Sequence, residues 1–86
     1  MRLKDKVIII TGSATGIGRA IAERSVKEGA RVLVHGLIES DTREVARALG
    51  DKASPHVDDL ADPASPGRLV ASALRAFGRI DAGGNN

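Results

Sequence analysis

VIIITGSATGIG, residues 7–18, joins an apolar run to a glycine-rich turn. The first four residues of this stretch are all β-branched, and a continuous run of that kind is typical of a strand buried on both faces, as in a parallel sheet. Lys6 precedes the run and Gly12 follows it. The stretch therefore predicts a strand at about residues 6–11, followed by a tight turn.

The residues after the turn predict a helix. Ile17, Ile21 and Val26 recur with a helical period on one side, and charged residues occupy many of the positions between them. The pattern stops at Gly29, and glycine commonly ends helices because it adopts a positive φ without strain. We expect this helix at about residues 17–28.

A second strand and a second helix come next. Residues 30–35, ARVLVH, are typical of a strand. Ser40 or Asp41 is suited to be the N-cap of the following helix, and Glu44 is positioned for a capping box. We expect the helix at about residues 41–49.

The third strand is short, and the helix after it has two possible starts. Residues 56–58 form the strand, and then Asp62 and Ser65 each precede a proline, as N-caps often do. We favour Ser65, because the earlier start would put the second proline where its missing N–H removes a helix hydrogen bond. The helix then covers about residues 66–77, and residues 80–82 begin a fourth strand. This alternation of strands and helices predicts a parallel sheet with right-handed crossovers.

The three glycines of the turn have separate physical uses. Gly12 accepts the backbone angles of a tight turn, Gly16 lets a pyrophosphate approach the main chain, and Gly18 lets the helix pack near the strand. The free N–H groups at the helix start would face the phosphates. The alternative is that the glycines only turn the chain. A P-loop is a poor alternative, because it needs a lysine followed by Ser or Thr after its last glycine, and Arg19 and Ala20 follow Gly18 here.

Composition argues against several classes of function. The formal net charge is +2 and the 13 basic residues are scattered, which argues against a nucleic-acid partner. The sequence has no cysteine and only two separated histidines, so we expect no metal site. The apolar run at residues 7–10 is far too short to cross a membrane. We expect a cytoplasmic protein without a membrane partner.

Three segments in order resemble the short-chain dehydrogenase/reductase family. The spacing Thr-Gly-x-x-x-Gly-Ile-Gly of residues 11–18 is similar to the family's cofactor signature. Asp59-Leu60 matches the acid and aliphatic residue that follow the family's third strand, and residues 77–81, FGRID, match its next helix–strand junction. Asn85-Asn86 matches the first half of the family's Asn-Asn-Ala-Gly turn. The resemblance covers essentially the whole chain.

The resemblance implies an α/β fold with a Rossmann-type parallel sheet, partial here, of about four strands in the order 3-2-1-4 and three helices. It implies NAD or NADP as cofactor. The implied contacts are Gly12, Ser13, Thr15, Gly16, Ile17 and Gly18 at the diphosphate and ribose, Asp59 and Leu60 at the adenine, and Asn85 beside the second ribose. The alternative for Asp59 is a capping role at the end of the strand.

The end of the second strand bears on the choice between NAD and NADP. An acid there binds the ribose of NAD, and a nearby arginine suits the phosphate of NADP. The sequence has Gly36-Leu37, which is neither, and the lack of an acid favours NADP slightly. Arg19 and Arg43 are candidate phosphate partners, and Glu39 is a candidate ribose acceptor. His35 is expected to pack near the adenine.

Family chemistry uses a Ser, a Tyr and a Lys, and this sequence has no tyrosine. We therefore assign no catalytic residue and expect the chain alone to be inactive. Residues 1–86 are interpreted as the amino-terminal portion of one NAD(P)-binding domain, truncated inside the Asn-Asn-Ala-Gly turn. The complete form is expected to be a homo-oligomer that transfers a hydride between NAD(P)(H) and a small carbonyl or alcohol substrate. A non-catalytic nucleotide-binding or pairing fragment and a non-functional product are the alternatives.

Overall fold

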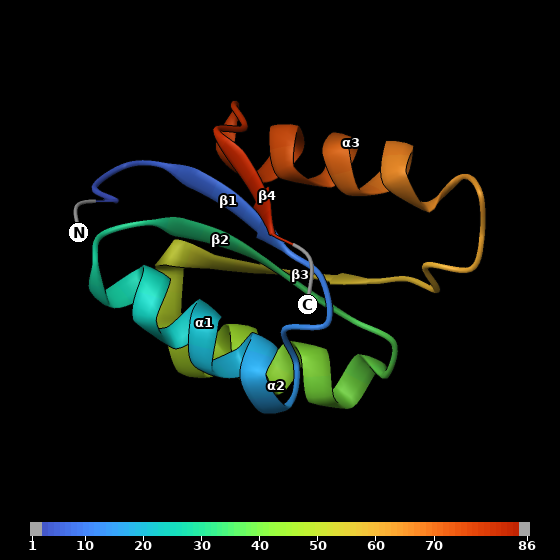
Figure 1. The fold of residues 1–86 in the computed structure, drawn as a ribbon, viewed down its shortest axis with the longest axis horizontal. Coiled ribbons are helices and arrows are strands. Elements are labelled where there is room, and N and C mark those ends of the chain that lie inside the picture. Colours follow the sequence, from blue (N-terminus) through green and yellow to red (C-terminus); the bar gives the residue numbers. More distant parts are fainter. Residues whose placement is uncertain (1–2, 85–86) are drawn as a thin grey trace.

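Residues 3–84 are described by a computed structural model, with the backbone alone described at 82–84. Figure 1 shows strands and helices that alternate along the chain, as the sequence predicts. The elements are β1 (Val7–Ile10), α1 (Gly16–Lys27), β2 (Arg31–Gly36), α2 (Glu39–Leu49), a 3₁₀ turn (Gly50–Lys52), β3 (Ala53–Val57), α3 (Ser65–Phe77) and β4 (Ala82–Gly84).

The four strands form one parallel sheet. Its order is β3-β2-β1-β4, so the expected order 3-2-1-4 is confirmed. In the register at the centre of the sheet, Ile9 lies opposite Leu33 on one side and Gly83 on the other. All strands therefore end at the same edge, and the loops that leave them meet there.

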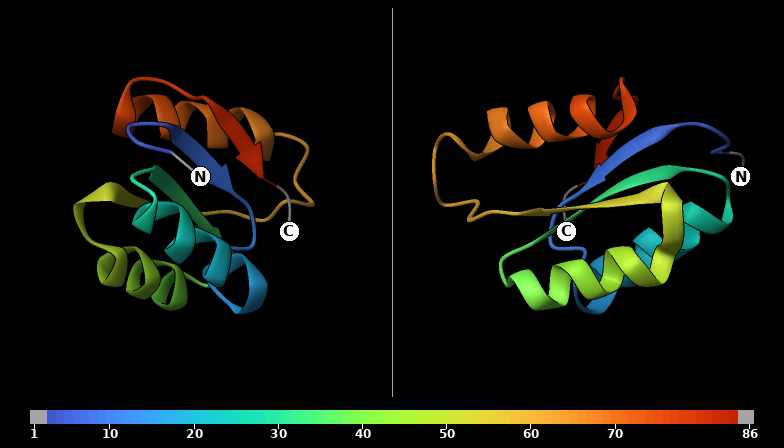
Figure 2. Two further views of the ribbon diagram at one scale, coloured as in Figure 1. Left: turned by 60° about the vertical axis from the view of Figure 1, so that its left-hand side comes forward. Right: turned by 180° about the vertical axis from the view of Figure 1, so that it is seen from behind.

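Helices cover both faces of the sheet. The helices α1 and α2 lie on one face and α3 crosses the other, as the views in Figure 2 agree. Each face has its own apolar core. The core under α1 and α2 contains Ile10, Ala22, Ala30, Val32, Val34, Val45 and Ala46, and the core under α3 contains Ile9, Leu33, Leu69 and Ala73.

The residues of α1 that face the sheet are small ones and not the large aliphatic ones. Gly18, Ala22 and Ser25 are the buried residues of this helix. Ile17 is 71% exposed and Ile21 is 44% exposed, so these two members of the apolar side lie outside the packed core. Small side chains allow the helix to approach the strands closely, and this leaves the two isoleucines on the outer side.

The starts of α2 and β3 differ from the sequence prediction for reasons that the packing explains. The helix α2 begins at Glu39 with Ile38 as N-cap, and no side chain caps it, so neither Ser40 nor Asp41 has the expected capping role. The strand β3 begins earlier than residues 56–58 and has Pro55 at its centre. Proline is tolerated there because β3 is the edge strand of the four and its outer side has no partner in the described sheet.

Of the two carboxyl-terminal elements, α3 lies close to its expected range, whereas β4 begins at Ala82 and not at residue 80 as expected. The helix α3 begins at Ser65 with Ala64 as N-cap and no side-chain capping bond, so Ser65 is the first helical residue and lacks the expected capping role. A proline follows in the first turn, and Gly78 ends the helix in the left-handed region at φ 79°. Two adjacent glycines form most of β4 and nevertheless pair with Ile9 and Ile10. Asp81 strengthens the entry to this strand, because its carboxylate accepts the Val7 N–H at 2.8 Å.

Candidate functional site

The glycine-rich turn leaves the carboxyl end of β1 and enters α1. Gly12 has φ 64° and Gly16 has φ 58°, which is the left-handed region where a side chain is strained. A Cβ added at Gly16 would meet no atom within 4 Å, so the space in front of this residue is open. The turn thus presents bare backbone to an open volume, as a diphosphate requires.

The start of α1 has free hydrogen-bond donors. The first backbone bond of the helix runs from the Arg19 N–H to the Thr15 carbonyl at 3.3 Å, so the N–H groups of residues 16–18 precede it. Thr15 is the N-cap and makes no side-chain capping bond. These donors and the positive end of the helix dipole favour an anion at this position.

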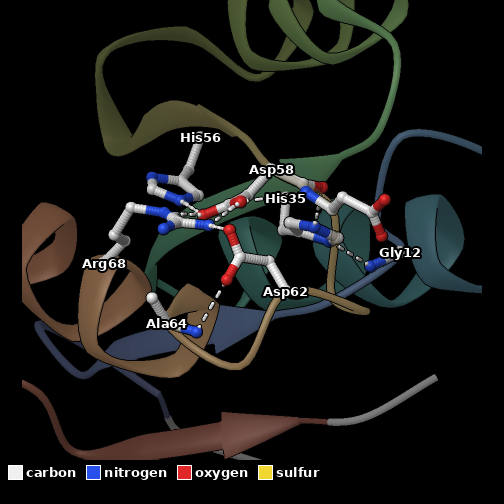
Figure 3. A network of polar contacts seen from close by, with 8 residues as sticks. Gly12, His35, His56, Asp58, Asp62, Ala64 and Arg68 are labelled. Carbon is white, nitrogen blue, oxygen red and sulfur yellow. Dashed lines mark hydrogen bonds and ion pairs between the residues drawn. The ribbon is translucent and has the colours of Figure 1, made fainter.

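His35, at the end of β2, holds the turn in place. Its Nδ1 accepts the Gly12 N–H at 2.9 Å, and its Nε2 lies 2.9 Å from the Asp58 carbonyl oxygen. A carbonyl only accepts, so Nε2 carries the proton and Nδ1 does not. Figure 3 shows the imidazole between these partners, and the residue is 4% exposed. One buried side chain therefore connects the turn to the segment that follows β3.

Ser13 has a different role from the ligand contact expected of it. It is fully buried. Its hydroxyl donates to the Ile10 carbonyl at 2.7 Å and accepts the His35 N–H at 2.9 Å. Its own N–H donates to the His35 carbonyl at 2.8 Å. Ser13 thus fastens the turn to β1 and β2 and presents no surface to a ligand.

A cavity of about 240 Å³, here called the turn cavity, lies between the turn and the start of α2. Three segments line it, namely Gly12, Ala14 and Thr15 of the turn, His35 and Gly36 of β2, and Leu37, Ile38 and Asp41 beyond it. Ligands of open parallel sheets bind at this edge, outside the carboxyl ends of the strands. Of the candidate residues of the turn, Gly12 and Thr15 thus line a cavity, and Gly16 lies beside Thr15.

A larger groove, of about 410 Å³, lies on the outer side of α1 and has a different character. Leu3, Ile17 and Ile21 supply much of its lining. Two of its polar residues, Arg24 and Glu28, bond each other at 3.5 Å. Ligand sites combine an apolar lining with a few converging polar groups. The turn cavity, beside free backbone donors, is therefore the better candidate site.

The adenine candidates lie at the same edge of the sheet but do not line the turn cavity. Asp59 is exposed, and its Oδ1 accepts the Ala61 N–H at 2.9 Å in a local turn. Leu60 is 46% exposed. The structure therefore supports a turn-forming role for the Asp59 carboxylate and leaves the Leu60 side chain accessible. Asn85 lies outside the described residues.

Asp58, the residue before Asp59, is the centre of a charged network in Figure 3. Its carboxylate accepts bonds from Arg68 at 2.8 and 2.6 Å and contacts His56 Nε2 at 2.9 Å, and its side chain is 7% exposed. The Arg68 bonds and then the His56 bond hold the pKa of Asp58 well below its ordinary value of 3.8. The Ala64 N–H and then Arg68 lower the pKa of Asp62. The network fixes the loop between β3 and α3.

The Asp58 network predicts that acid destabilises the fold. A carboxyl whose folded pKa is lowered contributes its full stability above the ordinary pKa, and this contribution is lost as pH falls toward the folded value. We expect the urea concentration at the midpoint of unfolding to decrease as the pH is lowered from about 5 to about 2. Asp58→Asn should be less stable at pH 7 and should lose part of this pH dependence. Urea melts followed by circular dichroism at several pH values measure both effects.

The control for this experiment is Asp51→Asn, which removes an exposed carboxylate outside the network. This variant should show the same dependence of stability on pH as the parent chain. If Asp58→Asn and the parent lose stability in parallel over the whole acid range, the network does not stabilise the fold as described.

Residues 3–84 contain neither a candidate metal site nor a candidate membrane-spanning helix. No group of three or more His, Cys, Asp or Glu side chains in this part of the chain is arranged to hold a metal ion. No helix in the described part has the length and apolar character needed to cross a membrane.

Comparison with known proteins agrees with the geometry. Residues 6–86 match the family described as short chain dehydrogenase. A sorbitol dehydrogenase of Cereibacter sphaeroides is 45% identical over 100% of this chain and 34% of its own length. A 3-hydroxyacyl-CoA dehydrogenase type-2 of Drosophila melanogaster is 39% identical over 92% of this chain and 31% of its own length. The chain thus spans about a third of the length of these relatives.

Solved structures give the same result. A 3-ketoacyl-(acyl-carrier-protein) reductase of Brucella melitensis, complexed with NADH, has a TM-score of 0.89 and 32% identity over 93% of this chain and 33% of its own. An apo glucose dehydrogenase of Caenorhabditis elegans has a TM-score of 0.89 and 34% identity over 100% of this chain and 39% of its own. Together with the glycine-rich turn at the edge of a 3-2-1-4 sheet, these matches show that the chain belongs to the short-chain dehydrogenase family.

Proposed function

We propose that this chain binds the dinucleotide NAD(P) at the carboxyl edge of its sheet. The diphosphate lies against the N–H groups of residues 16–18. One observation supports this assignment above all. The space in front of Gly16 is open, and Gly16 stands at the uncapped start of α1, directly after Thr15, which lines the turn cavity. Such a cradle suits a doubly charged diphosphate with a nucleoside beside it.

The proposal assigns roles to the remaining candidate residues. Gly12, Thr15 and Ile17 border the diphosphate and its ribose, and Gly18 is buried where α1 packs on the sheet. Leu60 offers an apolar surface for the adenine, and Asp59 shapes the loop that presents it. The contact of Asn85 with the second ribose stays a prediction.

The same proposal covers the complete reaction. The bound nicotinamide would accept or donate a hydride, and the substrate would be a small carbonyl or alcohol compound. The sequence has no tyrosine, so the proton-transferring tyrosine of the family is not among these 86 residues. We propose that residues 1–86 are the amino-terminal, cofactor-binding portion of a reductase that forms homo-oligomers. Sequencing the coding DNA beyond the Asn86 codon tests this, since the proposal requires a downstream Tyr-x-x-x-Lys.

Dinucleotide binding is tested with the 86-residue chain itself. We expect Gly16→Ala to raise the Kd for NAD(H) and NADP(H) about tenfold or more, since the added Cβ fills the open volume and strains the backbone at φ 58°. Titration calorimetry measures the affinity. The fluorescence of the reduced nicotinamide gives a second readout for NADH and NADPH.

Gly78→Ala is the matched control. Gly78 has φ 79° and an added Cβ there would also meet no atom within 4 Å, but it lies at the end of α3. Both variants should cost about 1 kcal/mol of folding free energy. Only Gly16→Ala should weaken binding. Equal affinity for the two variants, or no binding by the parent chain, would contradict the proposed function.

A further inference from the structure

We propose that Asp41 selects an unphosphorylated adenosine ribose, so that the turn cavity takes NAD in preference to NADP. This inference rests on the proposed function and specifies its cofactor. It reverses the slight preference for NADP that the lack of an acid at Gly36 suggests in the sequence. The position of residue 36, the charge within the turn cavity and the surroundings of two arginines support it.

Residue 36 cannot carry the ribose-binding acid. A Cβ at Gly36 would lie 2.1 Å from Thr42 Oγ1 and 2.8 Å from the Ala14 Cβ. Thr42 is fully buried, and its hydroxyl is fixed by a 2.7 Å bond to the Ile38 carbonyl. The Thr42 side chain thus fills the place that an acidic side chain at the end of β2 would need. The absence of an acid at Gly36 is a packing requirement, and it carries no information about the cofactor.

Asp41 supplies a carboxylate to the same cavity from the first turn of α2. It is exposed, it lines the turn cavity beside Leu37 and Ile38, and no hydrogen bond or ion pair engages its side chain among residues 3–84. Glu39, which the sequence also offers as a ribose acceptor, is instead bonded to Arg43 at 2.8 Å. An unpaired carboxylate at the cavity wall can accept the hydroxyls of a ribose.

The turn cavity has no cation for a ribose phosphate. Of its lining residues only Asp41 and His35 are ionisable, and both ring nitrogens of His35 are engaged. Arg19 and Arg43, the candidate phosphate partners, do not line the cavity. Each bonds a glutamate on its own helix, Arg19 with Glu23 at 3.2 Å and Arg43 with Glu39 at 2.8 Å. A phosphate on the ribose would therefore face a carboxylate of the same sign.

Binding of the two cofactors to the 86-residue chain tests the inference. We expect NADH to bind at least about tenfold more tightly than NADPH in titration calorimetry at low salt. Asp41→Asn should narrow this ratio to within a few-fold, and Asp41→Arg should reverse it. Glu44→Gln is the control, because it removes an exposed carboxylate from the same helix, away from the turn cavity. It should leave the ratio unchanged.

The outcomes separate this inference from the proposed function. If neither dinucleotide binds, the proposed function fails and the inference fails with it. If NADPH binds as tightly as NADH or more tightly, the cavity binds a dinucleotide but Asp41 does not select against the phosphate. An equal change of the ratio in Asp41→Asn and Glu44→Gln would assign the preference to overall charge and would also overturn the role of Asp41. Circular dichroism confirms that each of these surface variants keeps the parent fold.

Discussion

Gly36→Ala is expected to lower the free energy of unfolding by about 1–3 kcal/mol or more. The new Cβ would lie 2.1 Å from Thr42 Oγ1 and 2.8 Å from the Ala14 Cβ, distances at which atoms must move apart. Thr42 is fully buried and β-branched, so it has no free rotamer to adopt. Either α2 shifts away from β2, or the turn that carries Ala14 shifts, and both movements deform the turn cavity.

Gly67→Ala is the matched control for this change. Gly67 lies in the first turn of α3, and an added Cβ would meet no atom within 4 Å. Alanine there should stabilise the chain by up to about 1 kcal/mol, because it restricts the unfolded chain and favours the helix. The two variants are compared in urea melts followed by circular dichroism. The prediction for Gly36→Ala fails if its stability equals that of the parent.

A double mutant tests the cause of the expected loss. Thr42→Ala removes the hydroxyl that blocks the new Cβ and costs about 1 kcal/mol by itself, since the bond to Ile38 is lost. In the combination with Gly36→Ala the two losses should sum to more than the measured loss, because the steric conflict is relieved. Strict additivity would place the cause of the Gly36→Ala loss elsewhere than at Thr42.

The sequence predicted the architecture because local signals agree with one another in this chain. Four β-branched residues, a glycine-rich turn and a periodic helix specify the strand–turn–helix unit at residues 7–27 without long-range information. The resemblance supplied the strand order. The face of α1 was not predictable in the same way. A periodicity analysis takes the large apolar residues as the buried face of a helix. In the structure Gly18 and Ala22 of α1 are buried, and Ile17 is exposed.

The helix start at α2 shows a second limit. Ser40 and Asp41 have the side chains of an N-cap, but the chain becomes helical two residues earlier, at Glu39. The reason is tertiary, because Thr42 packs against Gly36 and bonds Ile38, which draws the first turn of α2 against the end of β2. The same packing places Asp41 at the turn cavity. As the N-cap that the sequence suggests, its carboxylate would have been engaged by the backbone of α2 instead.

The candidate site was predictable only where it depends on consecutive residues. The glycine-rich turn is a local feature, and its spacing was enough to identify it. The link from Gly12 through His35 to Asp58 spans three segments, with separations of 23 residues on either side of the histidine. No local pattern in a single sequence predicts hydrogen bonds between residues so far apart in the chain. Two adjacent acids, Asp58 and Asp59, were also indistinguishable until the structure placed one inside the network and the other in an exposed turn.

His35→Leu is expected to cost about 2–5 kcal/mol of folding free energy and to weaken dinucleotide binding about tenfold or more. Leucine fills the volume but leaves the Gly12 N–H and the Asp58 carbonyl without their partner in a site that is 4% exposed at residue 35. Small domains have only about 5–15 kcal/mol of stability, so part of the chain would unfold at moderate temperature. Thermal melts and titration calorimetry measure the two losses separately.

Two variants distinguish a bond to the turn from general loss of the buried ring. In His35→Asn the side-chain oxygen can still accept the Gly12 N–H, while the donor to Asp58 is lost, so binding should recover more than stability does. His56→Leu removes the other imidazole at Asp58 without touching the turn, and it should reduce stability while leaving the Kd for NADH within a few-fold of the parent value. If His35→Leu binds NADH as the parent does, the turn holds its shape without the imidazole. The phosphate cradle would then be specified by the glycine angles alone, and β2 would have no part in positioning the cofactor.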